Sequence, residues 1–343
     1  MTETVAGART ARDLLAWSRG CVDPALRAAV ARLPESMRPL VAYHFGWADE
    51  TGAPASGGGG KAVRPALVLA AARAVGEWGP ALPGAVAVEL VHNFSLLHDD
   101  VMDGDETRRH RPTVWKLFGP GPAILAGDSL LVAASDVLAA SGHPAAREAL
   151  RMLGAAVQDL IEGQGADLAF EQRADVGLDE CRLMAEGKTG ALLGCACALG
   201  GLLGGGSSEQ VAHLRRFGEA AGLAFQMVDD LLGIWGDPAA TGKPVFSDLR
   251  NRKKSLPVVA ALTSGTAAGR ELASLYAAPG EPAGADLVRA ARLVDQAGGR
   301  EWTRTEAATL LERAREHLKA AVPDPRGAAE LEALAALLAD RDR

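Results

Sequence analysis

The chain is poor in aromatic residues, which form only 4% of its 343 residues, and it carries a net charge of −7. So few aromatic rings leave no stacking platform for single-stranded nucleic acid. The excess of acidic side chains argues against binding to a phosphate backbone, because that binding relies on basic patches. Nucleic acid is therefore not an expected partner.

Cysteine is also scarce. The four cysteines are Cys21, Cys181, Cys195 and Cys197, and none of them forms a CxxC pair typical of metal sites. Two of them lie in an apolar run, which indicates free thiols buried in a core and a reducing compartment. The first 20 residues contain no apolar signal core. Together these absences predict a cytoplasmic protein.

No hydrophobic run clearly predicts a membrane span. The longest uncharged stretch, 189–208, has the length of one. Its glycine clusters and small side chains favour a buried core helix that is followed by a Gly/Ser turn. We therefore expect no membrane span.

Strand signals are almost absent, with no long alternating β-branched runs and no Asn-Gly hairpin turns. Apolar residues instead recur at helical spacing, and Gly/Pro clusters interrupt them over turn-length segments. The expected fold is a single all-α domain over 1–343, a bundle of about ten or more helices around a central cavity, with 1–10 as a flexible terminus. The predicted helices cover 11–33, 62–77, 82–103, 121–141, 145–171, 178–203, 209–235, 254–263, 284–297 and 304–321, with a packing helix in 328–343.

The segment 98–113, HDDVMDGDETRRHRPT, contains Asp99, Asp100 and Asp103 in a DDxxD pattern. On a helix, Asp99 and Asp103 lie on one face, where two carboxylates without a basic partner repel each other. A divalent cation removes this repulsion, and Mg²⁺ commonly binds one or two carboxylates plus substrate phosphates. Arg108 and Arg109 follow directly and are placed to hold phosphate oxygens.

A second acidic pair, Asp229 and Asp230, lies in the apolar segment FQMVDDLLGIWGD, with Asp237 beyond it. Two acidic pairs in apolar helices predict helices that face each other across a metal site. Basic residues near helix ends supply candidate phosphate ligands. They are Lys61, Arg64, Arg108, Arg109, Lys188, Lys243 and Lys253.

Two other motifs are excluded by their spacing. A calcium loop that starts at Asp99 would have Val101 at its third position, where an acidic residue or Asn is required, and His110 at its twelfth, where Glu is required. The GGGGK segment at 57–61 lacks the Ser or Thr that follows the lysine of a nucleotide-binding P-loop, and no strand precedes it.

Seven motifs together resemble the trans-isoprenyl diphosphate synthases of the polyprenyl synthetase family, in the order and spacing of that family. They are GGKxxRP at 59–65, ELVHNFSLLHDDVMD at 89–103, RRHRPT at 108–113, GQGADL at 163–168, KT at 188–189, FQMVDD at 225–230 and GDPAATGKPVFSDLRNRKKSLP at 236–257. The resemblance implies a homodimeric, Mg²⁺-dependent prenyltransferase, with Mn²⁺ as an alternative metal. Its substrates would be isopentenyl diphosphate and an allylic diphosphate, which ionises before it alkylates the isopentenyl double bond.

The resemblance also implies the roles of individual residues. Metal ions would be held by Asp99, Asp100, Asp103, Asp229 and, in support, Asp230. The allylic diphosphate would be held by Arg108, Lys188, Lys243 and Lys253, and isopentenyl diphosphate by Lys61, Arg64, His92 and Arg109. Lys188, Thr189, Gln226 and Lys243 would be catalytic, and Gln164 and Asp167 would line the same cavity.

The chain departs from the family pattern at Gly233, where the second DDxxD motif would end in aspartate. Metal binding by this helix is then expected to depend on Asp229. Phe94 and Ser95, five and four residues before Asp99, are implied to set the depth of the chain-growth tunnel. One large and one small residue resemble synthases that make geranylgeranyl diphosphate, with farnesyl diphosphate as the near alternative.

Two other function classes remain as hypotheses. A class I terpene cyclase shares the α-bundle and an Asp-rich motif, but it would leave the isopentenyl-site residues Lys61, Arg64 and His92 without a role. A non-catalytic subunit of a heteromeric synthase is supported only by Gly233.

Overall fold

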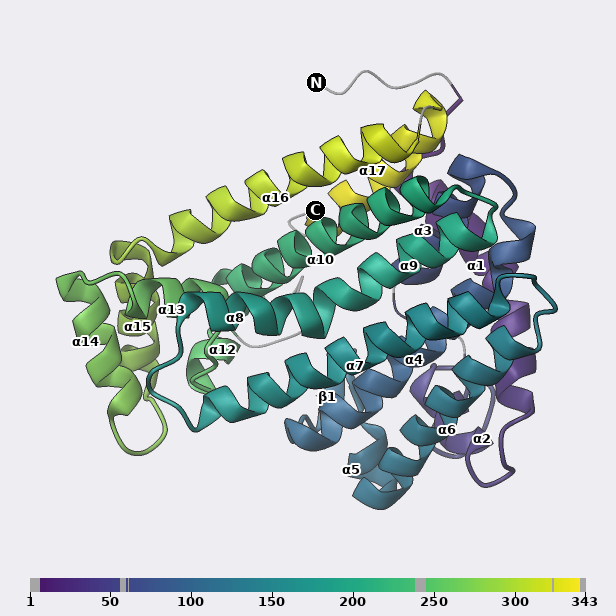
Figure 1. Ribbon diagram of the computed structural model, residues 1–343. Coiled ribbons are helices and arrows are strands. Elements are labelled where there is room, and N and C mark those ends of the chain that lie inside the picture. The colour runs from purple at the N-terminus through teal and green to yellow at the C-terminus, as the bar shows by residue number, and fades with distance from the viewer. Residues whose placement is uncertain (1–6, 56–59, 61, 238–244, 323, 340–343) are drawn as a thin grey trace. The chain divides into compact units, whose positions relative to one another are not determined.

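The computed structural model describes residues 7–55, 60, 62–237, 245–322 and 324–339, and its fold is all-α, as predicted (Figure 1). The helices are α1 (Ala11–Ala31), α2 (Arg38–His44), α3 (Val63–Val75), α4 (Leu82–Met102), α5 (Val114–Phe118), α6 (Pro120–Ala139), α7 (Ala146–Glu171), α8 (Leu178–Ala185), α9 (Ala191–Leu203), α10 (Ser208–Trp235), α12 (Ser247–Arg250), α13 (Leu256–Leu262), α14 (Ala267–Ala277), α15 (Gly284–Gln296), α16 (Gly299–Ala321) and α17 (Pro325–Ala339). A 3-10 turn, η1 (Gly79–Ala81), precedes α4, and a π-turn, η2 (Glu186–Gly190), joins α8 to α9.

Every predicted helical range contains a helix, but the described residues also form four short helices and one hairpin that were not predicted. The unpredicted helices are α2, α5, α12 and α14. The hairpin pairs β1 (Thr107–Arg108) with β2 (Arg111–Pro112), and its turn residues Arg109 and His110 have φ values of 52° and 63°. These residue types give little signal for a left-handed turn, which Gly, Asn and Asp usually form.

The contacts of the chain group into two compact units. Unit 1 comprises Met1–Gly154, Cys195–Arg215 and Leu318–Leu334, and unit 2 comprises Ala155–Gly194, Arg216–His317 and Ala335–Arg343. The long helices α7, α9 and α10 contribute residues to both units. The expected site residues before Gly154 therefore belong to unit 1, and those after it belong to unit 2.

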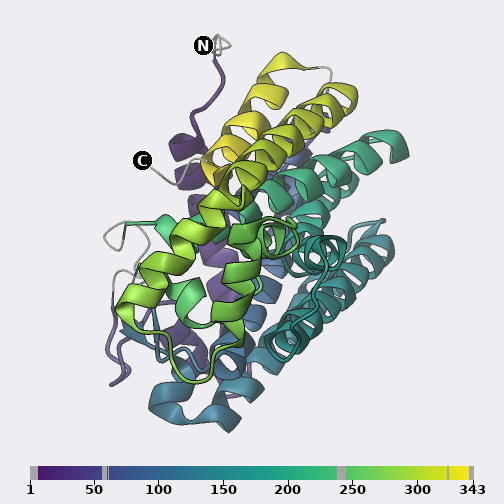
Figure 2. The ribbon, with the colours of Figure 1, turned by 90° about the vertical axis from the view of Figure 1, so that its left-hand side faces the viewer.

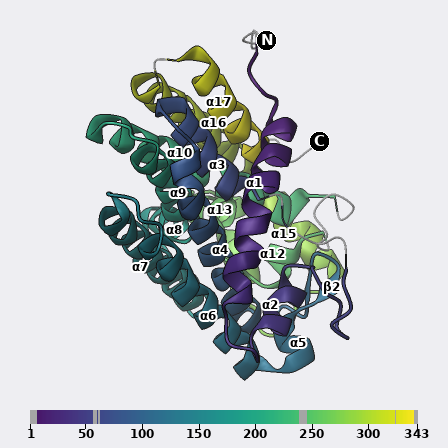
Figure 3. The ribbon, with the colours of Figure 1, turned by 90° about the vertical axis from the view of Figure 1, so that its right-hand side faces the viewer.

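Helix α4 forms the core of unit 1 and packs against α1, α3 and α6 (Figure 3). Its side chains are apolar on all sides over most of its length, so the helix is buried on all sides. Leu90, Val91 and Leu97 are no more than 1% exposed. Polar residues within this helix are therefore held on a rigid element.

Two apolar clusters form the core of unit 2. One joins α7, α10, α13 and α16 through Phe170, Met227, Leu256 and Leu310. The other joins α10 and α13 to α14 and α15, which lie side by side (Figures 1 and 2). These clusters fix the start of α13 and also α10, which carries the expected site residues Gln226, Asp229 and Asp230.

The uncharged run at 189–208 forms α9, and Leu193 and Leu199 are 1% and 0% exposed. The prediction of a buried helix there is confirmed. Within the described ranges, α6 is the one helix with the length and composition of a membrane span, and 33% of its most apolar 18-residue stretch is buried. Length and composition alone are weak evidence for a span.

Candidate active site

The first aspartate motif lies at the C-terminal end of α4 in unit 1. The helix ends at Met102, and the backbone N–H of Asp103 donates to the carbonyl of Asp99 at 2.8 Å. This bond confirms that Asp99 and Asp103 are one turn apart. Asp103 is exposed and Asp99 is half-buried, so their carboxylates are accessible at the helix end.

Asp100, between these two residues in the sequence, is buried. Its side chain is 3% exposed, and its Oδ1 accepts a hydrogen bond from Arg108 Nε at 2.6 Å. Burial raises the pKa of Asp100 to about 6, although Arg108 opposes this shift. Asp100 therefore orients an arginine in this structure, and its predicted role as a metal ligand stays a prediction.

The β1–β2 hairpin places three arginines around a small pocket. Arg108, Arg109 and Arg111 line it together with His44 and Asp100. Arg109 adopts a left-handed backbone conformation that costs free energy for a residue with a side chain. A Cβ atom on Gly60 would lie within 3.5 Å of the Arg109 guanidinium group, so the glycine makes room for it.

Arg64 and His92 are neighbours, as their predicted roles require. Arg64 Nη1 lies 3.2 Å from His92 Nε2. Because a guanidinium group can only donate, His92 Nε2 accepts this bond and its proton resides on Nδ1. Burial and nearby guanidinium groups, that of Arg64 first, hold the pKa of His92 well below 6.5. His92 is therefore a neutral side chain that orients Arg64.

Sequence reasoning missed the buried polar network behind this pair. Asn93 Nδ2 donates to the carbonyl of Glu89 at 2.8 Å and to its Oε1 at 3.1 Å, and Asn93 Oδ1 lies 3.1 Å from His44 Nε2. Burial raises the pKa of Glu89, while Arg64 and then Arg109 oppose the shift. Glu89 and Asn93 are polar residues four positions apart in an otherwise apolar helix, and this pattern in the sequence could have predicted a buried polar pair.

In unit 2, Lys188 and Thr189 lie on the π-turn η2, which packs tightly against α7. A Cβ atom on Gly163 of α7 would lie within 2.9 Å of backbone atoms of the turn. Lys188 Nζ contacts Asp167 Oδ2 at 2.5 Å, and Lys253 Nζ lies 3.9 Å from the same oxygen. One carboxylate thus gathers two predicted diphosphate ligands.

Thr189, Gln226 and Asp230 form a hydrogen-bonded chain. Thr189 Oγ1 donates to Gln226 Oε1 at 2.6 Å, and Gln226 Nε2 donates to Asp230 Oδ1 at 2.7 Å. Asp230 Oδ2 accepts the backbone N–H of Leu256, at the start of α13, at 2.9 Å. Burial, and next the charge of Asp248, raise the pKa of Asp230 to about 7. This geometry agrees with the supporting role expected for Asp230.

Two further features of unit 2 matter for the site. Gln164 is 5% exposed, and neither polar atom of its amide has a hydrogen-bond partner among the described residues. Such a buried amide is costly unless a ligand or water satisfies it. At the second aspartate motif, Asp229 is half-buried and Asp237 is exposed. Lys61 and Lys243 lie outside the described residues.

The donor set fits a divalent cation that is shared with a substrate. Within the described part of the chain, no three His, Cys, Asp or Glu side chains are gathered into a metal site. The accessible donors at Asp99 and Asp103 are carboxylate oxygens, which hard cations prefer. Mg²⁺ needs only one or two of them when phosphate oxygens and water complete its coordination. The assignment of individual metal ligands stays a prediction.

Comparisons with known proteins agree with this chemistry. The model of the family described as polyprenyl synthetase matches residues 47–292. A (2E,6E)-farnesyl diphosphate synthase of Mycobacterium tuberculosis is 49% identical over 97% of this chain and 94% of its own length. A geranylgeranyl diphosphate synthase of the same organism is 46% identical over 96% of this chain and 94% of its own length.

Solved structures give the same result. The crystal structure of a polyprenyl synthetase from Streptomyces coelicolor A3(2) has a TM-score of 0.91 and 50% sequence identity, over 95% of this chain and 99% of that one. The family match covers well over half of the residues, and the relatives match nearly the whole chain. The chain belongs to the polyprenyl synthetase family.

Proposed function

We propose that this protein elongates an allylic diphosphate by head-to-tail addition of isopentenyl diphosphate in the cytoplasm. Membership of the family makes the chain a prenyltransferase. The observation that carries the proposal is that two separate pairs of cations each lie near one carboxylate, that of Glu89, which is 8% exposed, and that of Asp167, whose side chain is 17% exposed. In unit 1, Arg64 and Arg109 lie near Glu89.

In unit 2, Lys188 and Lys253 lie near Asp167. Each group keeps one more positive charge than its carboxylate neutralises, and a cation set of this kind attracts a diphosphate. Two such groups suit a reaction that joins two diphosphate substrates. The Lys188 group would hold the allylic diphosphate and the Arg64 group the isopentenyl diphosphate.

The residues beside Lys188 suit the ionisation step. When the C–O bond of the allylic diphosphate breaks, negative charge grows on the leaving diphosphate and positive charge on the allyl group. Lys188 and Lys253 stabilise the former, and the oxygen dipoles of Thr189 and Gln226 stabilise the latter. The double bond of isopentenyl diphosphate then attacks the cation, and the released diphosphate takes the proton that leaves. Gln164 lies on α7, as Asp167 does, and its buried amide would line the same cavity.

Magnesium ions, or manganese in their place, would be held by Asp99 and Asp103 in unit 1 and by Asp229 in unit 2, and would neutralise charge on the leaving diphosphate. Asp100 and Asp230 would act mainly by orienting Arg108 and Gln226, because their oxygens already accept hydrogen bonds from these side chains. This division of roles follows from the hydrogen bonds of the two motifs.

The proposed product is geranylgeranyl diphosphate. Phe94 is 6% exposed, and its ring contacts that of His98 edge-on at a centroid distance of 4.7 Å. Ser95 is small and donates to the carbonyl of His92 at 2.8 Å, so it adds no bulk one turn before Asp99. Farnesyl diphosphate remains the second candidate, because a relative named for that product is 49% identical.

Product analysis tests both the reaction and the chain length. The protein is incubated with Mg²⁺, labelled isopentenyl diphosphate and each of three starters, dimethylallyl, geranyl and farnesyl diphosphate. We expect geranylgeranyl diphosphate from all three, little product from Asp99→Ala, and shorter products from Ser95→Phe but not from Ser95→Ala. No incorporation of label would overturn the proposal, and a cyclic hydrocarbon would favour the cyclase. An inactive chain that gains activity only with a second protein would favour the non-catalytic subunit.

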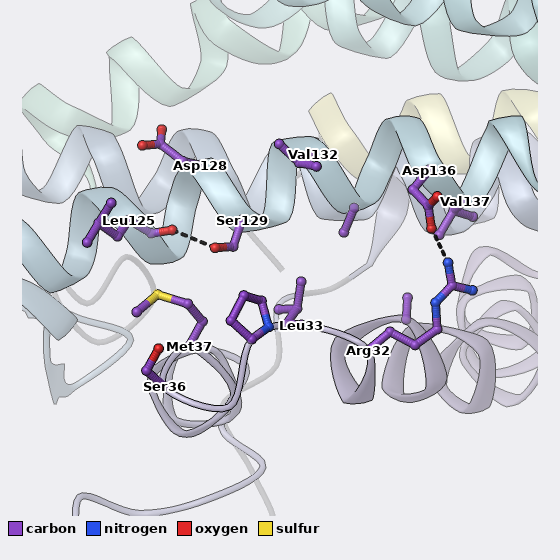
Figure 4. Close-up of a pocket in the computed structure, with 13 residues that line it drawn as sticks. Arg32, Leu33, Ser36, Met37, Leu125, Asp128, Ser129, Val132, Asp136 and Val137 are labelled. Atoms are coloured by element: carbon purple, nitrogen blue, oxygen red, sulfur yellow. Dashed lines mark hydrogen bonds and ion pairs between the residues drawn. The ribbon is translucent and has the colours of Figure 1, made fainter.

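We also propose that the protein is a homodimer that associates through α6. On this helix Ile124, Leu125 and Val132 are 41%, 56% and 69% exposed, which is unusual for large apolar side chains. Leu125 and Val132 border a groove of about 570 Å³ between α6 and the segment after α1, where Leu33 and Met37 lie (Figure 4). A second copy of this apolar helix is a self-complementary partner, as a two-fold interface requires.

Light scattering tests the homodimer. Val132→Asp places a charge in the centre of the apolar face and is expected to give a monomer. Val288→Asp, at a valine that is 43% exposed on α15, makes the same chemical change elsewhere and is expected to leave a dimer. A wild-type monomer, or two variants with equal effects, would contradict an interface on α6.

A further inference from the structure

The β1–β2 hairpin that carries Arg109 is short and has an unfavourable turn. Each of its strands has two residues, and an isolated two-stranded hairpin is marginally stable at best in water. Arg109 and His110 both have positive φ values, a conformation that Gly and Asn adopt readily and that costs free energy for Arg and His. Contacts from outside the hairpin must therefore hold the turn in this conformation.

Helix α2 supplies such contacts through Tyr43. The phenolic O–H of Tyr43 donates to the carbonyl of Pro112, in β2, at 2.7 Å. Arg111, also in β2, donates from Nη1 to the carbonyl of Tyr43 at 3.1 Å and from Nη2 to the carbonyl of Ala48 at 2.9 Å. Its Cζ atom lies 4.2 Å from the centroid of the Tyr43 ring. We call these interactions of Tyr43 and Arg111 the hairpin clamp.

The hairpin clamp is anchored in the core of unit 1. Tyr43 is 3% exposed, and Val41 on the same helix is 0% exposed. Phe118 of α5 packs edge-on against the Tyr43 ring at a centroid distance of 5.8 Å. A buried ring with such close neighbours has little freedom to move. Helix α2 is therefore a rigid support for the hairpin.

The two strands also place two like charges opposite each other. Arg108 pairs with Arg111 across the hairpin, where like charges repel. Each guanidinium group has its own acceptors, because Arg108 Nε donates to Asp100 and Arg111 donates to backbone carbonyl groups outside the hairpin. Arg108 therefore has a separate anchor in Asp100. The backbone of Arg109 forms the turn itself, so its position changes with that of β2.

We propose that Tyr43 and Arg111 are positioning residues, which hold the β1–β2 turn so that the Arg109 guanidinium group meets isopentenyl diphosphate. Neither residue needs to touch the substrate, since Arg111 donates to backbone carbonyls and Tyr43 donates to the hairpin itself. This inference rests on the proposed function, in which Arg109 binds isopentenyl diphosphate. Loss of the hairpin clamp should weaken this binding and leave the allylic site, with its own anchors Asp100 and Asp167, nearly unchanged.

Calorimetric titration with isopentenyl diphosphate, without an allylic starter, measures binding apart from turnover. Arg111→Met removes the donors and keeps an unbranched side chain, and it should bind about 10- to 100-fold more weakly than the wild type because Arg109 is displaced. Arg111→Lys keeps the charge but not the planar fork of donors, so it should recover part of the affinity. Tyr43→Phe removes one hydrogen bond and should weaken binding by about 2- to 10-fold.

Lys116→Met is the matched control. Lys116 is a cation close to the hairpin in sequence, and it pairs with Glu106, but the two side chains are 45% and 61% exposed and neither belongs to the hairpin clamp. This variant removes a nearby positive charge and should bind isopentenyl diphosphate as the wild type does. Thermal unfolding of each variant shows whether the fold is retained, and Tyr43→Phe is the mildest change of the set.

A double-mutant cycle separates positioning from direct contact. Arg109→Gln alone should remove most of the affinity, and Arg111→Met added to it should have little further effect, because the hairpin clamp then has no guanidinium group to position. Steady-state kinetics supplies a second readout. The KM for isopentenyl diphosphate should rise in Arg111→Met and Tyr43→Phe, while kcat and the KM for the allylic starter change by less than about twofold.

Equal losses from Arg111→Met in the wild-type and Arg109→Gln backgrounds would overturn the assignment, because Arg111 would then act without Arg109. Wild-type affinity in both Arg111→Met and Tyr43→Phe would also overturn it, as would equal rises in KM for the two substrates. A wild-type protein that binds isopentenyl diphosphate but never incorporates it would refute the elongation reaction and not the role of the hairpin clamp.

Discussion

Removal of the charge on Asp167 should lower the free energy of unfolding and should increase the stabilisation that a bound diphosphate gives. Asp167 Oδ2 lies 2.5 Å from Lys188 Nζ and 3.9 Å from Lys253 Nζ, and its side chain is 17% exposed. Burial tends to raise the pKa of Asp167, but the two lysines outweigh burial and lower it. Asp167 is therefore ionised, and Asp167→Asn leaves two ammonium groups close together without a counter-charge.

The expected loss lies between the values for exposed and buried ion pairs. An exposed pair contributes about 0 to 1 kcal/mol, and breaking a buried one costs about 3 to 5 kcal/mol. The side chains of Asp167 and Lys188 are 17% and 20% exposed, so we expect a loss of about 2 to 3 kcal/mol in the free energy of unfolding. For a chain of this length, the melting temperature should fall by about 3 to 5 °C.

The assay is urea unfolding of the wild type and Asp167→Asn, with and without inorganic pyrophosphate. A bound diphosphate stabilises the native state by mass action. In the variant, the bound diphosphate also supplies the negative charge that the two lysines have lost, and it no longer competes with Asp167 for Lys188. Saturating pyrophosphate should therefore reduce the stability difference between the two proteins by about 1 kcal/mol or more.

Glu271→Gln is the matched control. Glu271 pairs with Arg289 in the same unit, but both side chains are about half exposed, at 45% and 56%. This variant should lose less than about 1 kcal/mol and should show no special response to pyrophosphate. The reasoning would be refuted by a stability difference between the wild type and Asp167→Asn that pyrophosphate leaves unchanged, because the lysines would then not be the diphosphate ligands.

Three other predictions follow from close contacts. Burial, then the nearby arginines, lower the pKa of His44 from 6.5 to about 3. Below pH 6.5 the unfolded state therefore binds a proton that the folded state does not, and the protein becomes less stable as the pH is lowered. Between pH 6.5 and 5 the wild type should lose about 1.7 kcal/mol more than His44→Gln in urea unfolding; parallel pH profiles would contradict this. Gly163→Ala should lower turnover at least tenfold and also lower the melting temperature, because its Cβ would clash with the backbone of the turn that carries Thr189 and displace it; unchanged kinetics would show that the turn tolerates the shift. Gly127→Ala should alter the product lengths seen by chromatography, because its Cβ would collide with the His98 ring that packs on Phe94; a wild-type product pattern would separate His98 from chain-length control.

Much of the fold follows from local sequence patterns. The apolar periodicity of α4, α7 and α10 predicted each of these helices to within three residues at either end, because helix formation depends on neighbours three and four positions apart. The same spacing placed Asp99 and Asp103 one turn apart, and the contact between them confirms it. Short elements such as α12 and the β1–β2 hairpin were missed, since they have too few residues to show a period.

The sequence alone determined the helical class, the two acidic motifs and the basic residues around them, because each depends on residue types at short spacing. The tertiary structure decided which of these groups meet. Glu89 and Asn93 connect to His44 across 49 residues, and Arg111 of the hairpin donates to the carbonyl groups of Tyr43 and Ala48. Such contacts depend on how buried helices pack, and a motif read along one element cannot reveal a partner supplied by another.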